Sequence, residues 1–512
     1  MNPTAAPRVG KQVVDIVTAG MYSDCLMVLR EYIQNAADSI DEAVERGLLR
    51  PPEGLIEIVV DGERRAIAVT DNGVGVAPSN VERDLCSLGC SPKVGQKRRG
   101  FRGVGRLGGL GYCDQIEFET RSAGCKQVSC VSWDGRVLRE SLRSNGEEKT
   151  ADAAIRAAIR VGVRRPLLGE PPHFFRVTMR GVQRFHEDLL MNLHAIAAYL
   201  GRVAPVGFDT RRFPFANEIG AHLAGVEGYR CYKVRLNGCP ILRPHERIIE
   251  FSQALVDEIR GVELFDVVGA SGERIGRGWY ARTGCYASLP SRMTMRGIRV
   301  RQGNIEVGDE YYLADSFTER RFAAWHIGEI HLGYSVRANA RRDGFEQSPD
   351  YEALLEQTLV LGKHLSYLCR ESSKNRSSRL TVERALRGVE KSIGQLFFVD
   401  TVHFSRTRTE VERILSKLEA ARARGGCDTD FAKRLSRARR AFDELVSDPP
   451  YLATAIDGRT LRYVRPQELL LDIARTVVED HCATASREDL LARIVMPYLK
   501  RQSAGTPPGC RR

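Results

Sequence analysis

The stretch "SDCLMVLREYIQNAADSIDEAVERG" (residues 23–47) combines an apolar helix face with a line of polar side chains. The polar residues Glu31, Asn35 and Asp38 fall at i, i+4 and i+7, so they share a narrow stripe. The opposite face should pack on a sheet and consists of Leu26, Leu29, Ile33, Ala36, Ala37 and Ile40. A polar stripe is most often a solvated face. The alternative is a site where carboxylate and amide oxygens meet a ligand or a hydrated Mg²⁺ ion, which prefers such ligands.

The next segment predicts a hairpin with an acid at a strand end. "LIEIVVDGERRAIAVTDNG" (55–73) indicates two strands across a turn at Asp61-Gly62. The second strand ends at Asp71, and Gly73 and Gly75 follow at alternate positions. A hairpin turn uses the same residue types. A carboxylate beside two small residues could instead accept hydrogen bonds from an amine-bearing heterocycle.

A third segment, "RRGFRGVGRLGGLG" (98–111), holds six glycines and four arginines. Its G-x-G-x-x-G pattern is typical of a dinucleotide-binding loop, but such a loop must leave a buried strand. The preceding "SPKVGQKRRGF" (91–101) is polar and basic, which argues against a dinucleotide-binding loop. The chain has no G-x-x-x-x-G-K-[ST] loop either. A flexible surface loop is the alternative that this segment alone leaves open.

In order, the three segments read E-x-x-x-N-x-x-D, D-N-G-x-G and G-F-R-G-V-G. This succession resembles the Bergerat-fold ATPases, which include DNA gyrase B, HtpG-type heat-shock chaperones, histidine kinases and MutL. The resemblance covers residues 20–122 and implies an N-terminal Bergerat α/β sandwich, in which a mixed sheet carries helices on one face. It also implies that the domain binds ATP and Mg²⁺.

The resemblance implies a role for each matching residue. Glu31 resembles the general base, Asn35 the magnesium ligand and Asp38 a neighbouring pocket acid. Asp71 resembles the adenine-reading carboxylate, next to the pocket-shaping Gly73 and Gly75. Residues 86–100 would form a mobile lid. Lys93 lies near the start of that lid, and its end would bring backbone N–H groups to the phosphates at Gly100, Gly103, Val104 and Gly105.

One position departs from the family pattern. Its members carry Gly-Thr on a later strand, with the threonine directed toward the adenine. In "FFRVTMRGV" (174–182), Phe175 falls at that position and Thr178 lies on the opposite strand face, so Thr178 receives no role.

A downstream segment, "HLGYSVRANARRDGFEQS" (331–348), resembles the middle-domain segment of HtpG-type chaperones. There an Asn-x-x-Arg-acid run, matched by Asn339, Arg342 and Asp343, delivers an arginine to the γ-phosphate. A basic surface is the alternative explanation for these arginines. The "GFRG" stretch (100–103) is closer to MutL, which keeps a DNA-associated function open.

The pattern along the 512 residues predicts an α/β protein in four parts. These are the ATP-binding domain (1–200), a middle α/β transducer domain (201–365), a helical, charge-rich region (366–450) and a small helical C-terminal region with a disordered tail (451–512). The segment 186–202 is expected to be a helix that leads out of the first domain. The sequence has no apolar run that could span a bilayer and no apolar signal stretch at residues 1–20, so we expect a cytoplasmic protein without a membrane partner.

The composition limits the partners without identifying them. The formal charge of +12 permits a nucleic-acid or phosphate partner. The 13 cysteines form no C-x-x-C pair, and we expect most of them to be small buried residues of a reducing compartment. The expected function is a Mg²⁺-dependent ATPase of the HtpG-like chaperone type, which acts on protein clients and forms an ATP-dependent homodimer. The alternative is a MutL- or MORC-like ATPase that acts on DNA in repair or defence against foreign DNA.

Overall fold

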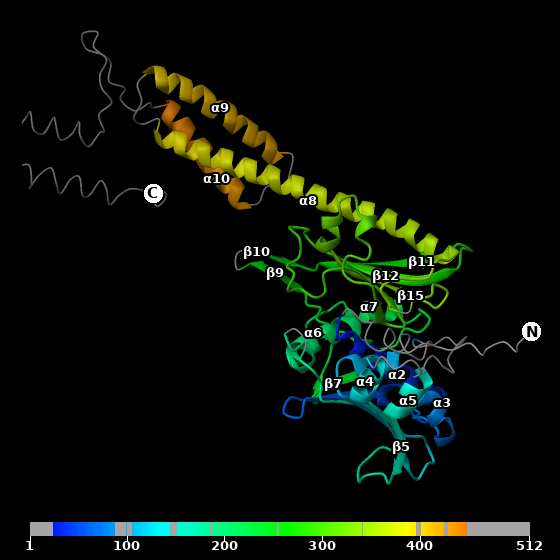
Figure 1. Cartoon of the computed structure of the whole chain (residues 1–512). Coiled ribbons are helices and arrows are strands. Elements are labelled where there is room, and N and C mark those ends of the chain that lie inside the picture. Colours follow the sequence, from blue (N-terminus) through cyan, green and yellow to red (C-terminus); the bar gives the residue numbers. More distant parts are fainter. Residues whose placement is uncertain are drawn as a thin grey trace, which may run out of the picture. The chain divides into compact units, whose positions relative to one another are not determined.

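The computed structural model describes most of the chain as two compact units. The first unit ends at Ser372 and the second begins at Ser373. The expected division into four parts, with boundaries at residues 200, 365 and 450, stays a prediction. The first unit contains two large sheets, and the described part of the second unit is helical (Figure 1). The described residues are 24–87, 99, 105–143, 151–184, 187–252, 255–339, 341–395, 401–423 and 429–447.

The first sheet has the strand order β5-β4-β3-β6-β2-β1-β7-β8. Its neighbouring strands are antiparallel except β1 and β7, which are parallel. The predicted hairpin at Asp61-Gly62 is confirmed, and the sheet takes two strands from beyond residue 200. The strands are β1 (Leu55–Asp61), β2 (Ala66–Asp71), β3 (Gln115–Arg121), β4 (Val128–Asp134), β5 (Ile159–Arg164), β6 (Phe174–Arg180), β7 (Lys233–Leu236) and β8 (Cys239–Pro240).

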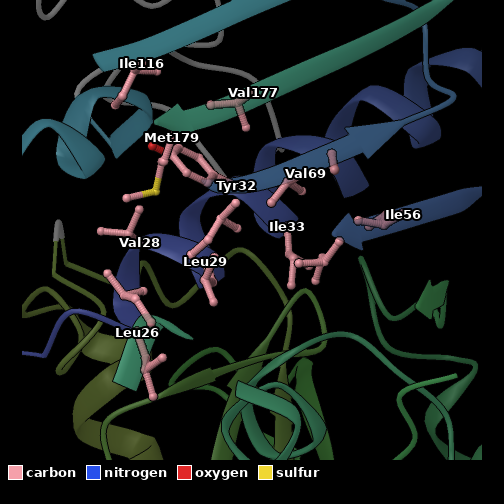
Figure 2. Close-up of a cluster of buried hydrophobic side chains, with 14 of the residues drawn as sticks. Leu26, Val28, Leu29, Tyr32, Ile33, Ile56, Val69, Ile116, Val177 and Met179 are labelled. Carbon is pink, nitrogen blue, oxygen red and sulfur yellow. The ribbon is translucent and has the colours of Figure 1, made fainter. Parts of the chain in front are cut away.

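Helices cover one face of this sheet, as the sequence predicts. The central helix α2 (Met27–Glu45) packs on β1 and β2, and all six residues of its predicted apolar face are buried. Figure 2 shows α2 side chains such as Ile33 gathered with Ile56 and Val69 of the sheet. The other helices here are α3 (Val81–Leu85), α4 (Gly135–Arg143), α5 (Ala151–Ala158) and α6 (Leu193–Val203).

The opposite face of the sheet carries charged side chains. Arg180 Nε donates to Glu117 Oε2 at 2.6 Å, and Arg176 Nη1 donates to Glu119 Oε2 at 3.0 Å. Both pairs join β6 to β3. This alternation of buried apolar and exposed charged positions is typical of an antiparallel sheet that is packed on one side.

The helix predicted over residues 186–202 begins later than expected. Residues Leu189–Met191 form a 3₁₀ turn, and α6 starts at Leu193. The reason is Asn192, whose side chain accepts a hydrogen bond from the Ala195 N–H at 3.1 Å and so caps the helix.

The second sheet of the first unit has the order β11-β12-β15-β13-β14. Within it, β13 and β14 form an antiparallel hairpin. The helix α7 contacts β12, and a separate two-stranded sheet forms from β9 and β10. The elements are α7 (Ala216–Leu223), β9 (Ile248–Ser252), β10 (Leu255–Glu258), β11 (Gly261–Val268), β12 (Arg274–Arg282), β13 (Gly297–Gln302), β14 (Ile305–Val307) and β15 (Ile327–Leu332).

The helical region predicted over 366–450 is confirmed in its described part, and its first helix begins earlier, at Pro349. It consists of α8 (Pro349–Gln395), α9 (Thr401–Ala423) and α10 (Thr429–Ser447). The long helix α8 belongs to both units, and its first half packs on the second sheet through Leu354 and Leu365. The expected small domain at 451–512 lies outside the described residues. Among the described helices, none combines the length and the apolar character that a bilayer span requires.

A buried charge network lies where the second sheet meets the end of α6 and the residues just after it. Glu329 on β15 is 0% exposed and accepts hydrogen bonds from Arg243, Arg301 and His331. Arg243 also donates to the Val206 carbonyl, and Arg301 to the Arg202 carbonyl at the end of α6. Burial alone would raise the pKa of Glu329, but the two guanidinium groups and His331 hold that pKa well below its ordinary value.

We predict that Glu329→Gln lowers the free energy of unfolding by about 3–5 kcal/mol, because two buried guanidinium groups lose their counter-charge. Since the folded-state pKa is depressed, the stability from Glu329 is present above the ordinary carboxyl pKa of about 4.3 and is lost as the pH falls below it. The variant should therefore show a smaller loss of stability on acidification. Glu258→Gln is the control, because its pair with Arg247 is exposed and should contribute less than about 1 kcal/mol. Equal urea midpoints for the two variants would contradict the prediction.

Candidate functional site

The polar stripe of α2 is buried rather than solvated. Glu31 is 7% exposed and Asp38 is 1% exposed, while Asn35 between them is half-buried. A buried carboxylate is unfavourable unless it is paired or hydrogen-bonded. The burial of Glu31 and Asp38 excludes the explanation that the stripe is a solvated helix face.

Glu31 lies against the start of the glycine-rich segment. A Cβ atom built on Gly105 would be 2.7 Å from Glu31 Oε2, closer than real Cβ atoms come. A side chain at position 105 would therefore have to displace the Glu31 carboxylate, whereas glycine lets the backbone lie against it. Arg30 donates to the other carboxylate oxygen at 3.3 Å. The structure thus brings together Glu31 and Gly105, which are 74 positions apart in the sequence.

Asp38 is held by Arg99, which no motif in the sequence marks as a site residue. The Arg99 backbone N–H and its Nη1 both donate to Asp38 Oδ1, at 3.1 and 3.4 Å. Nη1 also donates to Asp41 Oδ2 at 2.6 Å, and the remaining nitrogens donate to the carbonyls of Gly228 and Gly303. Burial alone would lower the pKa of Arg99, but the surrounding tyrosines and acids raise it above its ordinary value. No sequence signal separates Arg99 from the neighbouring arginines.

Asp71 ends β2 and forms a second cluster with the two glycines that follow. It is 4% exposed, and Asp71 Oδ1 accepts the Gly73 N–H at 2.8 Å. A Cβ on Gly73 would lie 2.1 Å from Ser39 Oγ on α2. Gly75 has φ +66°, and a Cβ there would lie 2.2 Å from the Arg121 carbonyl oxygen. Both positions require glycine, and Ser39 places this cluster beside the stripe on α2.

The strand opposite Asp71 has the alignment that the sequence predicts. In the β2–β6 register Asp71 pairs with Phe175, whereas Thr178 pairs with Ala68, three positions along the strand. Because strand faces alternate, Thr178 lies on the face away from Asp71.

Two polar contacts near Asp71 were not found from the sequence. His173 Nδ1 lies 2.7 Å from the Gly73 carbonyl oxygen, and Thr120 Oγ1 accepts the Val76 N–H at 2.8 Å. Both side chains are buried. They fix the backbone of the glycine turn, and neither belongs to a local motif.

Arg342 reaches this region from the segment after β15. It adopts φ +53°, its N–H donates to the Asn339 carbonyl, and Asn339 Nδ2 donates to Asp343 Oδ1 at 2.6 Å. This tight turn buries Arg342 at 5% exposure and leaves Arg341 exposed. Arg342 Nη2 donates to the Arg99 carbonyl at 3.0 Å.

The charges around Arg342 come from both parts of the first unit. Burial lowers the pKa of Arg342 to about 10, and Glu31 is the strongest charge that opposes this shift. Arg30 Nη2, beside Glu31, donates to the Arg341 carbonyl at 2.9 Å. The arrangement places an arginine of the second half of the unit among the acids of α2. Lys93, Gly100, Gly103 and Val104 lie outside the described residues.

The first part of the chain is similar to known proteins. Residues 22–155 match the family described as histidine kinase-, DNA gyrase B- and HSP90-like ATPase. The chaperone protein HtpG of Geobacter metallireducens is 28% identical over 143 residues, 24% of this chain and 22% of that protein. HtpG of Escherichia coli K12 is 29% identical over 142 residues, 24% of this chain and 23% of that protein. The chain thus spans less than a quarter of the length of the curated relatives it matches.

Proposed function

The first part of the chain, matched over residues 22–155, belongs to the ATPase superfamily that includes histidine kinases, DNA gyrase B and HSP90-like proteins, and on this premise we propose that the protein hydrolyses ATP to ADP and phosphate. The burial of Glu31 beside Gly105 and Arg342 carries the proposal. A carboxylate in this setting can orient a water molecule and take its proton. Arg342 can neutralise the charge that develops on the transferred phosphoryl group.

The remaining residues fit the substrate and the metal. Asp71 is a buried acceptor in a turn that needs two glycines, so it can accept hydrogen bonds from the adenine amine. Asn35 offers an uncharged amide oxygen between Glu31 and Asp38, the kind of hard ligand that Mg²⁺ accepts. Magnesium, when bound there, would neutralise charge on the phosphates.

The position of Arg342 supports an ATP-driven conformational machine of the HtpG type. The arginine belongs to the segment after β15, yet its hydrogen-bond partner Arg99 is bound to Asp38 and Asp41 of α2. Hydrolysis would then require the second half of the unit to be docked on the ATP-binding half. In such a machine each ATP cycle would change how the two halves dock. This conformational change would act on bound protein clients.

A DNA-associated ATPase is the second candidate, because the helical unit is basic. The described residues of that unit, 373–395, 401–423 and 429–447, hold sixteen lysines and arginines against eight aspartates and glutamates. Such an excess attracts nucleic-acid phosphates.

Glu31→Ala should bind Mg²⁺-ATP nearly normally and lose about 10²–10⁴-fold in turnover, the usual contribution of a general base. Calorimetry gives the affinity and phosphate release gives the rate. Glu57→Ala is the control. Glu57 lies on β1, next to the strand that carries Asp71, but it is only half-buried and belongs to neither the Glu31 nor the Asp71 cluster. A Glu31→Ala variant that hydrolyses ATP at the wild-type rate would refute the catalytic role.

Arg342→Ala should turn ATP over at least about tenfold more slowly while its ATP affinity changes little, because the guanidinium acts on charge that develops in the transition state. Arg341→Ala is the matched control: it removes the neighbouring, exposed arginine and should have a small effect. Equal kcat values for the two variants would show that Arg342 does not reach the reacting phosphate.

The two candidate functions differ in how binding to DNA depends on salt. The chaperone-type function predicts weak DNA binding that ATP does not alter. The DNA-associated function predicts an affinity that ATP changes and that falls by about 10³-fold or more between 50 and 200 mM salt if several phosphates are contacted. Fluorescence anisotropy with a labelled duplex, with and without a non-hydrolysable ATP analogue, distinguishes them.

A further inference from the structure

Three metal-binding side chains from distant parts of the sequence meet in the second sheet region. Cys285 follows β12, His326 immediately precedes β15, and Cys369 lies in the first half of α8. All three are buried, and their ligand atoms lie within 4.8 Å of one another. His326 Nε2 is 3.2 Å from Cys369 Sγ. Within the described part of the chain, this is the one group of three or more His, Cys, Asp or Glu residues with such spacing.

The spacing agrees with that of ligands around one zinc ion. Zinc binds thiolate sulfur at about 2.3 Å and imidazole nitrogen at about 2.0–2.1 Å, in tetrahedral geometry. Those bond lengths separate a sulfur and a nitrogen ligand by roughly 3.5 Å. The observed distance of 3.2 Å between His326 Nε2 and Cys369 Sγ is close to this separation. All three ligand atoms lie within 4.8 Å of one another, so small side-chain shifts would bring them to zinc-binding distances.

The backbone at Cys285 is a second, independent observation. Cys285 has φ +47°, a conformation that residues with a side chain rarely adopt and that glycine adopts at little cost. The chain places a glycine one residue earlier, at position 284, and keeps a cysteine at the strained position. Its N–H donates to Thr283 Oγ1 at 3.3 Å, and Gly284 N–H donates to Asp257 Oδ2 at 2.7 Å. Unfavourable backbone conformations of this kind concentrate at binding sites, where the side chain must point in one direction.

We propose that Cys285, His326 and Cys369 bind one zinc ion, with a water molecule as the fourth ligand. Two thiolates and an imidazole favour zinc over the hard cations Mg²⁺ and Ca²⁺. Binding releases the two thiol protons to solvent. The ion would join the loop after β12, the start of β15 and helix α8, and would fix the first half of α8 on the second sheet. The site is independent of the proposed ATPase function.

The test is the metal content of the full chain, purified without chelators and measured by mass spectrometry. We expect about one zinc per chain, and at least a tenfold loss of zinc in Cys285→Ser and in His326→Gln. Cys25→Ser is the matched control, because Cys25 and Cys285 have the same 7% exposure and Cys25 lies outside the group. His326→Cys should keep the metal, since a third thiolate is also a zinc ligand.

A measurement on the unaltered chain covers the case in which the variants fail to fold. Zinc-free protein under reducing conditions should bind one equivalent of Co²⁺ and develop the intense visible bands of tetrahedral cobalt–thiolate sites. Wild-type protein with neither zinc nor cobalt bands would overturn the proposal, and the three side chains would then form a hydrogen-bonded core cluster. A disulfide between Cys285 and Cys369, detected after thiol blocking in freshly lysed cells, would overturn it as well.

Discussion

The pairing of desolvated charges is the constraint on which the arrangement of the first unit depends. Glu329 is wholly buried, and its counter-charges are Arg243, between β8 and β9, and Arg301 on β13. Both arginines also donate to carbonyls at the end of α6 and just beyond it. A buried charge without its partner is strongly unfavourable, so moving these segments apart without exposing them to water would leave buried charges unpaired. The network therefore fixes where the second sheet lies relative to the end of the first domain's helices.

The same constraint organises the candidate site. Glu31, Asp38 and Asp41 of α2 are buried, and their partners include groups of the glycine-rich segment and of the turn that holds Arg342. Because Arg342 donates to the Arg99 carbonyl, a change at Asp38 can reach the turn after β15 through two hydrogen bonds. This short path is the physical basis for the proposed link between ATP and the movement of the second half of the unit. The expected homodimer, the cytoplasmic location and the partner stay predictions.

The sequence predicted what depends on local periodicity. The apolar face of α2, the β1–β2 hairpin and the helical region after residue 349 follow from spacing and turn residues, and the ordered motifs indicated the family. It did not predict Arg99, His173 or the Cys285 group, because their partners lie tens to hundreds of positions away and no local pattern marks them. The polar stripe of α2 shows most clearly what the sequence cannot predict, because polar residues at i, i+4 and i+7 occur both on solvated helix faces and in buried sites. Only the tertiary fold, which buries Glu31 and Asp38, distinguishes them.

The central claim is that one nucleotide contacts both halves of the first unit. The most direct measurement is an experimental structure of the full chain with Mg²⁺ and a non-hydrolysable ATP analogue. We expect the adenine amine on the Asp71 carboxylate and the γ-phosphate within hydrogen-bond distance of Arg342, with Glu31 beside it. A bound analogue whose γ-phosphate lies away from Arg342, with that arginine still on the Arg99 carbonyl, would contradict it.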